Sequence, residues 1–406
     1  MNGRFNAIAL LPAFYGAQAL AFEGDPFKFS LSAGYLHDSN VFRLPDDFLV
    51  STLTGSDQRG DTTYQLAGSL GFERDYGPQH IRLNANITDS RYSTYSFLDN
   101  TAYDAGASWR LNFLTKSFVE VAYGRAQYLL GFADFRSAVK NIIARDSFDL
   151  RSLVEFRPRW SVIASTGIAT YRNSSDLRSA TDFELGYVEA GLRYDWLSGS
   201  NWDFAWRSSD GRYPNQQLND AAGNPIPGAV DNNFRENTVL ARLSWAATGA
   251  TRFNGQLGYT ERRLPNQSER NFSGLTWRLG GELQTSDKFF VSATIRNELS
   301  AYQDIVSNYA VLRGISLGAT WSVTDKAQVR GSAEWLKRDF RGDPGLVLTT
   351  QSRREDTIKS LGVSFALQPT SYLEWTTDLR REERDSNQNG FNYRANTLFT
   401  RLNFRN

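Results

Sequence analysis

The chain has 406 residues, a formal net charge of +1, no Cys, two His and a mean hydropathy of -0.47. Without Cys it has no disulfide, no thiolate metal site and no Cys nucleophile. A net charge this close to zero provides no overall field that would attract nucleic acid. No apolar run reaches the roughly 18 residues of a transmembrane helix.

Residues 1–21 are predicted to be a secretory signal peptide that is cut after Ala21. A short apolar stretch from Ala7 to Tyr15 follows the basic residue Arg4 and precedes the small residues around Ala21. The alternative interpretation of this segment is an N-terminal core strand. Because no linker-like change of composition follows, residues 22–406 are predicted to form one domain, as large barrels do.

Side chains alternate with period two along almost all of residues 22–406, which is typical of β-strands. At the start, the apolar residues Phe27, Phe29 and Leu31 alternate with Lys28 and Ser30. One face of each predicted strand is therefore apolar, and the other carries charged, amide or Gly residues.

Short and long connections take turns between these segments, as they do in outer-membrane barrels with short periplasmic turns and long extracellular loops. The sequence therefore predicts an all-β fold, a single antiparallel transmembrane β-barrel of about 18 strands in the outer membrane of a Gram-negative type of cell. The predicted short turns are residues 76–79, 114–116, 158–160, 197–200, 247–250, 286–288, 323–326 and 368–371, and the longer loops include 37–61, 131–144, 214–232 and 339–354.

A soluble β-sandwich or propeller is the alternative, because it would also alternate. Hairpin length, the signal peptide and the position of the Trp residues favour the membrane barrel. Most Trp residues are predicted near strand ends or short turns, where an interfacial aromatic girdle would lie. They are Trp109, Trp160, Trp196, Trp202, Trp245, Trp277, Trp321, Trp335 and Trp375.

Two segments have special features. Residues 398–404 resemble the terminal strand that outer-membrane barrels present to their assembly machinery. At Tyr187 and Val188 the apolar positions change from odd to even numbers. We expect a bulge there, or a strand whose upper part has left the membrane.

The residues that could perform chemistry are few. His37 is predicted at the outer rim and His80 at the periplasmic rim, so no catalytic dyad or His metal site can use both. Neighbouring carboxylates such as Glu382 and Glu383 point to opposite faces of a strand and cannot share a proton. The sequence has no P-loop, dinucleotide fingerprint or zinc spacing. We therefore expect no enzyme activity, no cofactor and no metal.

The polar face is the predicted wall of the lumen. Any wide barrel needs such a hydrophilic wall, so its charges are also explained without a specific solute. Alternatively, guanidinium groups held by carboxylates form donor tracks for carboxylates or hydroxyls of a passing polymer, and an aromatic residue gives sugar rings a surface to slide on. The predicted conduit residues are Arg82, Arg110, Arg151, Arg193, Arg242, Arg278, Arg296, Arg330, Arg380, Glu282, Glu298 and Tyr372.

Several segments resemble the EpsL family, which consists of predicted outer-membrane barrels encoded with exosortase-associated exopolysaccharide systems. The resemblance begins at residues 37–45 with the sequence HDSNVFRLP and extends over essentially all of residues 22–406. It includes residues 72–74 with 79–83, residues 92–103, and residues 157–160 followed by 171–174. It implies export of a newly made polysaccharide across the outer membrane, and it supplies no binding residues.

Two functions follow as hypotheses. The first is a channel that exports an exopolysaccharide from the periplasm to the cell surface. Its expected partners are outer-membrane lipid, the polysaccharide chain, and periplasmic or inner-membrane components of the synthesis machinery, without nucleic acid. The alternative is a general or substrate-selective porin for small solutes.

Overall fold

The protein is described here from a computed structural model. The structure describes residues 26–134, 137–197, 199–216, 232–265, 271–304, 307–341 and 353–406. The predicted signal peptide lies outside the described residues, as do most of the predicted loops 214–232 and 339–354. No helix within the described ranges is long and apolar enough to cross a membrane.

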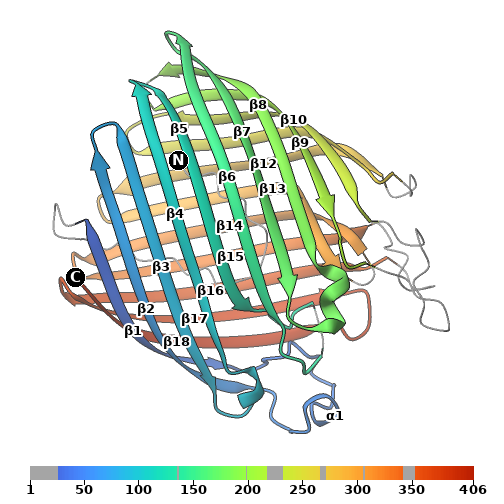
Figure 1. The fold of residues 1–406 in the computed structure, drawn as a ribbon. Helices are drawn as coiled ribbons and strands as arrows, with labels where there is room; N and C mark the ends of the chain where they lie inside the picture. Colours follow the sequence, from blue (N-terminus) through green and yellow to red (C-terminus); the bar gives the residue numbers. More distant parts are fainter. Residues whose placement is uncertain are drawn as a thin grey trace.

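In the described part of the chain, eighteen antiparallel strands form one closed sheet (Figure 1). Each strand pairs with its neighbours in the chain, and β1 pairs with β18 from Ser30 opposite Arg405 to Asp38 opposite Thr397. The predicted antiparallel barrel of about 18 strands is therefore confirmed. The strands are β1 Phe27–Asp38, β2 Asp61–Tyr76, β3 Gln79–Tyr92, β4 Asn100–Leu114, β5 Ser117–Leu129, β6 Ile142–Arg157, β7 Trp160–Asn173, β8 Phe183–Leu197, β9 Ser200–Arg212, β10 Phe234–Ala246, β11 Thr251–Arg263, β12 Phe272–Ser286, β13 Phe289–Asp304, β14 Ser307–Thr324, β15 Ala327–Arg341, β16 Glu355–Thr370, β17 Leu373–Ser386 and β18 Tyr393–Arg405; the short helices are α1 Ser51–Thr54, η1 Ser96–Leu98 and η2 Asp176–Thr181.

The period-two pattern separates the two faces of the wall. On the outer face, Leu31, Leu66 and Ile87 are 59%, 66% and 54% exposed. On the inner face, the Ser30 and Ser69 hydroxyls lie 2.6 Å apart across β1 and β2. Fully burying a Leu or Ile contributes about 1.5–3 kcal/mol, so a continuous apolar belt of this kind is stable in lipid and unstable in water.

The two ends of the barrel differ in their connections. One end has tight turns, such as Gly77-Pro78 between β2 and β3, where Gly77 has a φ of 60°. The other end, which we call the mouth, has the longer loops, including residues 39–60 with helix α1. Exposed Trp residues such as Trp160, Trp202 and Trp375 lie within a few residues of the short turns, as a girdle at that end requires.

The bulge expected at Tyr187 and Val188 does not occur. Strand β8 keeps an unbroken register with β7 and β9 at these residues. The apolar positions change because Phe183 and Leu185 near the mouth face the lumen, where they pack with Phe234 of β10. The change in the sequence pattern marks the height at which the inner face becomes apolar.

Candidate functional site

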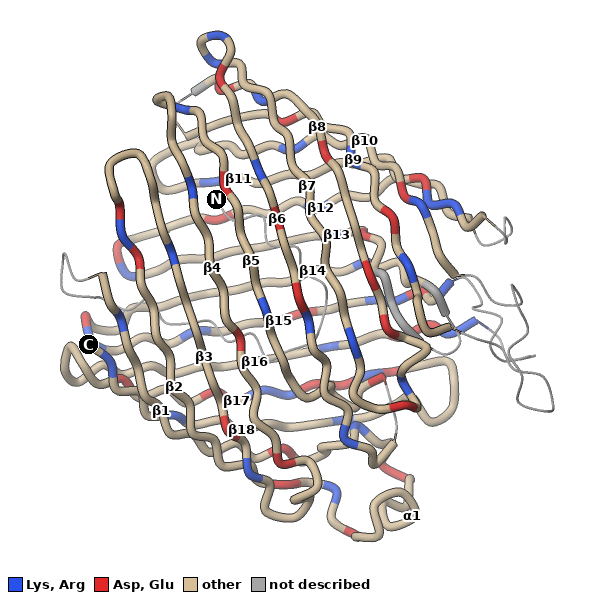
Figure 2. The backbone as a smooth tube through the Cα atoms, viewed as in Figure 1, with Lys and Arg blue, Asp and Glu red and all other residues tan. Residues whose placement is uncertain are grey.

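The charged residues predicted to line the lumen lie on the inner face. The paired registers place Arg82, Arg110 and Arg151 on the same face as the polar residues of β3, β4 and β6, opposite the exposed apolar side chains. Figure 2 shows basic and acidic positions along the barrel strands. The same face holds Arg193, Arg242, Arg278, Arg296, Arg330, Arg380, Glu282 and Glu298.

Arginine–carboxylate pairs make up much of this wall. The Arg193 guanidinium donates two hydrogen bonds to the Asp203 carboxylate, at 2.7 and 2.8 Å. Paired guanidinium groups of this kind are fixed in orientation and keep further N–H donors available. Other pairs are Arg82 with Glu73, Arg110 with Glu120, Arg278 with Glu298, Arg296 with Glu334 and Arg380 with Glu382.

Glu189 on β8 joins two arginines from neighbouring strands. Arg242 on β10 donates to both Glu189 oxygens, at 2.8 and 2.7 Å, and Arg207 on β9 approaches the same carboxylate at 2.6 Å. The Glu189 side chain is only 3% exposed. One buried carboxylate therefore holds two cations side by side on the lumen wall.

Tyr372 lies apart from the predicted conduit residues. It belongs to the turn between β16 and β17, and its ring centroid is 5.7 Å from that of Phe404. The Phe404 side chain is exposed with the outer apolar set. Tyr372 therefore does not provide the expected aromatic surface for sugar rings in the lumen.

The two histidines lie at opposite ends of the wall, as expected. His37 is near the mouth end of β1, and its Nδ1 atom lies 3.1 Å from the Thr62 hydroxyl. His80 is near the short-turn end of β3, within 2.7 Å of Asp75 and 3.2 Å of Glu73. Each histidine is bound by its own neighbours, and the pair has no shared site.

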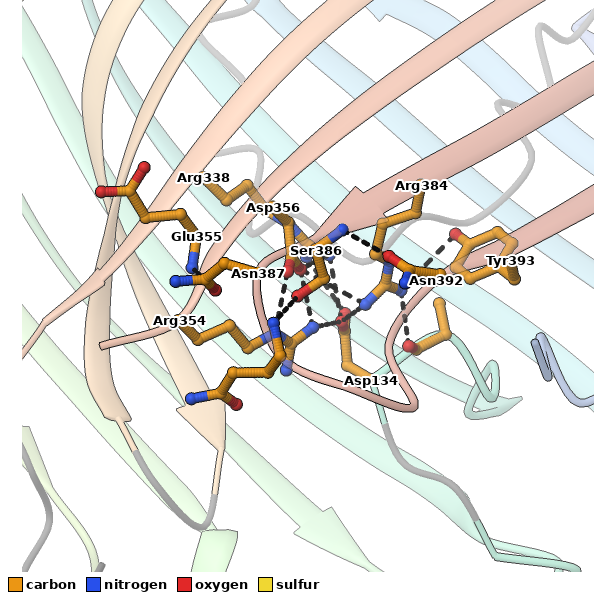
Figure 3. Close-up of polar contacts among 12 residues, drawn as sticks. Asp134, Arg338, Arg354, Glu355, Asp356, Arg384, Ser386, Asn387, Asn392 and Tyr393 are labelled. Carbon is orange, nitrogen blue, oxygen red and sulfur yellow. Dashed lines mark hydrogen bonds and ion pairs between the residues drawn. The ribbon is translucent and has the colours of Figure 1, made fainter. Parts of the chain in front are cut away.

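A single carboxylate at the mouth contacts three arginines from the opposite part of the ring (Figure 3). Asp134, in the loop of residues 130–141 between β5 and β6, lies 3.1 Å from Arg338, 3.3 Å from Arg354 and 2.8 Å from Arg384. Asp356 contacts the same three guanidinium groups at 3.2, 2.7 and 3.4 Å. We call these five residues the arginine cluster.

The arginine cluster is buried and holds the loop across the lumen. The Arg384 and Asp356 side chains are 0% exposed, and Arg384 also donates a 2.5 Å hydrogen bond to the Ala133 carbonyl oxygen. The cluster has three cations and two anions, so the Asp134 carboxylate lowers its net charge from +2 to +1. Leaving a buried guanidinium without its partner costs several kcal/mol.

The charge state of Asp134 follows from these contacts. Burial alone would raise the pKa of Asp134, but the positive charges of Arg338 and Arg384, a hydrogen bond from Arg338 and the charge of Arg354 outweigh it. They hold the pKa of this carboxyl well below its ordinary value of 3.8. The side chain is therefore an anion at neutral pH.

The loops at the mouth share a small core of their own. Phe42 from residues 39–60, Tyr95 from residues 93–99 and Phe132 from residues 130–141 are buried together. The ring of Phe42 lies 4.9 Å from that of Tyr95 and 4.7 Å from that of Phe132. Since Phe132 is two residues from Asp134, this core and the arginine cluster hold the same loop from two sides.

The arginine cluster was not predicted from the sequence, although part of the signal was present. Arg338 and Arg384 follow Arg330 and Arg380 on the inward positions of β15 and β17, so alternation places them in the lumen. Nothing in a linear pattern pairs them with Asp134, which is more than 200 residues away from Arg338.

Comparisons with known proteins support the fold. No family model matches the chain, and no curated protein matches it. Solved structures with a similar fold include three proteins of Pseudomonas aeruginosa. OccK1 (OpdK) has 9% identity and a TM-score of 0.50, over 93% of this chain and 98% of that chain. OccK2 (OpdF) has 11% identity and a TM-score of 0.51 over the same shares. OccK11 (OpdR) has 10% identity and a TM-score of 0.50, over 94% of this chain and 96% of that chain. At these identities the likeness shows the fold alone: the chain has the closed 18-strand barrel found in OccK porins.

Proposed function

We propose that this chain is an outer-membrane channel for small polar solutes and that it favours solutes with a carboxylate. The observation that carries the proposal is the arginine cluster, in which three guanidinium groups at the mouth surround the carboxylate of Asp134. Arginine binds carboxylates with directed, charge-assisted hydrogen bonds. A group of arginines that holds the carboxylate of a loop can hold the carboxylate of a solute by the same contacts.

In the proposed path, an acidic solute exchanges with Asp134 and the loop moves aside. The solute then meets Arg380, which faces the lumen on the same strand as Arg384 and is closer to the short-turn end. Further arginines on the wall, such as Arg296 and Arg278, continue the series of donors. Their paired carboxylates keep the wall close to neutral, which prevents a solute from binding too tightly to leave.

The solved neighbours suggest suitable test solutes. OccK2 was solved in complex with glucuronate, and OpdK was solved with vanillate. Both compounds carry a carboxylate. Glucose differs from glucuronate at a single carbon, so this pair separates carboxylate recognition from passage by size.

The test is ion current through the protein in a planar lipid bilayer. We expect added glucuronate to interrupt the wild-type current at concentrations at which glucose has no effect. The Asp134→Asn variant should respond at lower glucuronate concentrations, because the internal competitor is weakened. Asp146→Asn, which removes an exposed carboxylate 3.6 Å from Arg125, is the matched control. Equal responses to glucose and glucuronate would contradict the carboxylate preference, and the absence of any current would contradict the channel itself.

A second candidate function is export of an exopolysaccharide, favoured by the resemblance of residues 37–45 and the other quoted segments to the EpsL family. In this proposal the polymer passes from the periplasm to the surface, with periplasmic or inner-membrane components of the synthesis machinery as partners. Deleting the gene should leave polymer in the periplasm. Normal surface polysaccharide in the deletion strain would exclude export and leave the small-solute channel.

A further inference from the structure

An apolar depression of about 1080 Å³ runs over the outer face of β11–β18. It follows two adjacent rows of paired residues, which cross the strands. One row starts at Phe253 on β11, and the other starts at Thr251. The first row continues through Gly281, Ala293, Leu317, Ala333, Leu361 and Arg381 to Asn396, and the second through Leu283, Val291, Ala319, Gly331 and Val363 to Leu379.

Small side chains create the depression. Gly281, Ala293 and Gly331 lie among large apolar neighbours such as Leu317 and Leu361, which are 49% and 62% exposed. A Cβ atom added to Gly331 would meet no other atom within 4 Å, so space is open above this position. The groove is therefore a recess in the apolar belt, with walls formed by larger aliphatic residues.

The groove is longer than one acyl chain needs, since each leaflet makes up about half of the roughly 30 Å hydrocarbon core. Seven steps between adjacent strands, at about 4.8 Å each, give roughly 34 Å from β11 to β18. Phe253 is two residues from the short-turn end of β11, whereas Arg381 is five residues from the mouth end of β17. The groove thus runs obliquely across the belt, from the short-turn end toward the mouth.

The apolar groove meets one exposed basic residue at its mouth end. Arg381 is the charged residue of the two rows, and its side chain is exposed. Within the described residues, no carboxylate lies within 4.0 Å of its guanidinium group. The charged outward positions just beyond it are largely paired with one another, Lys337 with Glu355, Lys359 with Asp385 and Arg394 with Glu383, so Arg381 supplies the positive charge at this end of the groove.

We infer that this groove binds a membrane lipid that has a phosphorylated head group. The inference rests on the membrane placement proposed above, and it does not depend on which solute the lumen carries. The acyl chains lie along the apolar rows, and the phosphate contacts Arg381. A second copy of the chain would fill the recess with apolar side chains and leave the charge of Arg381 without a partner, so a phosphorylated lipid fits both parts of the site.

The test uses the full chain, purified in detergent, and native mass spectrometry. The two probes are dipalmitoyl phosphatidic acid and dipalmitoylglycerol, which have the same acyl chains and differ in the phosphate. We expect the wild-type protein to retain phosphatidic acid at least several-fold better than dipalmitoylglycerol. The variant Arg381→Gln should lower this retention about fivefold, the factor that corresponds to about 1 kcal/mol for one basic residue at a charged lipid surface.

The groove itself is tested by Gly331→Leu, whose side chain would enter the open space. It should lower the retention of both lipids. The matched controls are Arg91→Gln, which removes an exposed outer-face arginine of β3, and Gly68→Leu, which enlarges an outer-face glycine of β2. Heat-modifiable migration in gels verifies that every variant forms the barrel.

Three outcomes would overturn the proposal. Equal retention of the two lipids would exclude recognition of the phosphate. If Arg91→Gln lowered the retention of phosphatidic acid as much as Arg381→Gln, the lipid would be held by the general charge of the outer face and not by this site. If Gly331→Leu changed a dimeric mass and left lipid retention unchanged, the groove would be an interface between copies. A protein with no channel activity but selective lipid retention would refute the proposed solute pathway and support this site.

Discussion

Arg338 and Asp134 form a forked ion pair across the mouth of the barrel, with both N–O distances at 3.1 Å and 204 residues between them in the chain. The pair joins a wall strand, β15, to a loop that begins on the other side of the ring. Arg354 and Arg384 contact the same carboxylate, so this side chain joins the loop to three arginines at once.

Replacing Asp134 with Asn should release this loop. The variant loses one of the two carboxylate charges that contact the three guanidinium groups, and hydrogen bonds to charged groups contribute about 1.5–3 kcal/mol each. We expect a larger mean conductance and more current noise than in the wild type. The control Asp146→Asn should leave both unchanged. Identical single-channel records for Asp134→Asn and the wild type would mean that the loop does not limit the current.

The same contact predicts how the channel responds to acid. The pKa of Asp134 is lower in the folded protein than its ordinary value of 3.8. The charged carboxylate therefore stabilises the closed loop above that value, and the stabilisation is lost as the pH falls through the lowered pKa. Conductance should stay constant from neutral pH down to about pH 4 and rise only in stronger acid. A rise in conductance above pH 5 would mean that groups other than Asp134 cause it. The Asp134→Asn variant should lack the rise that comes from protonation of Asp134.

The shared core of the mouth loops can be tested at Phe42, which is 1% exposed. Truncating a fully buried Phe to Ala costs about 3–5 kcal/mol. In Phe42→Ala we expect faster hydrogen exchange in residues 39–60 and 93–99, because both loops lose contacts to its ring. The wall strands should keep their protection. Phe48→Ala, in the same loop but 38% exposed, is the control and should exchange like the wild type.

Charge reversal on the wall should change ion selectivity. Arg242→Glu would place a second carboxylate beside Glu189, and Arg278→Glu would do so beside Glu298. We expect the ratio of K⁺ to Cl⁻ permeability to rise about a few-fold. The reversal potential in a KCl gradient measures this change. In the export hypothesis, the same variants should weaken polymer flux. Arg263→Glu, on the outer face and 73% exposed, should change neither quantity. Unchanged selectivity would mean that these arginines serve only as part of a general hydrophilic wall.

The barrel could be predicted from the sequence because the two faces of each strand lie in different environments, so apolar and polar side chains alternate along it. Arg242 and Arg278 could be placed on the inner face for this reason alone. Tyr372 could not, because a turn residue has no alternating neighbours on both sides to fix its direction. The contact between Asp134 and the arginines could not be predicted from the sequence, since the course of a loop across the mouth depends on packing partners such as Phe42. The apparent irregularity at Tyr187 had the same origin, because apolar residues there face a loop-lined mouth and not lipid.

The pairing of Ser30 with Arg405 has a consequence for how this wall is made. The residues that seal the ring come from its first and last strands, so no partial chain can be closed. Until the last strand is in place, β1 and β17 each have an edge with unpaired N–H and C=O groups, which cost several kcal/mol apiece in hydrocarbon. A shortened chain without β18 should therefore stay out of the bilayer, even though most of its hairpins are intact.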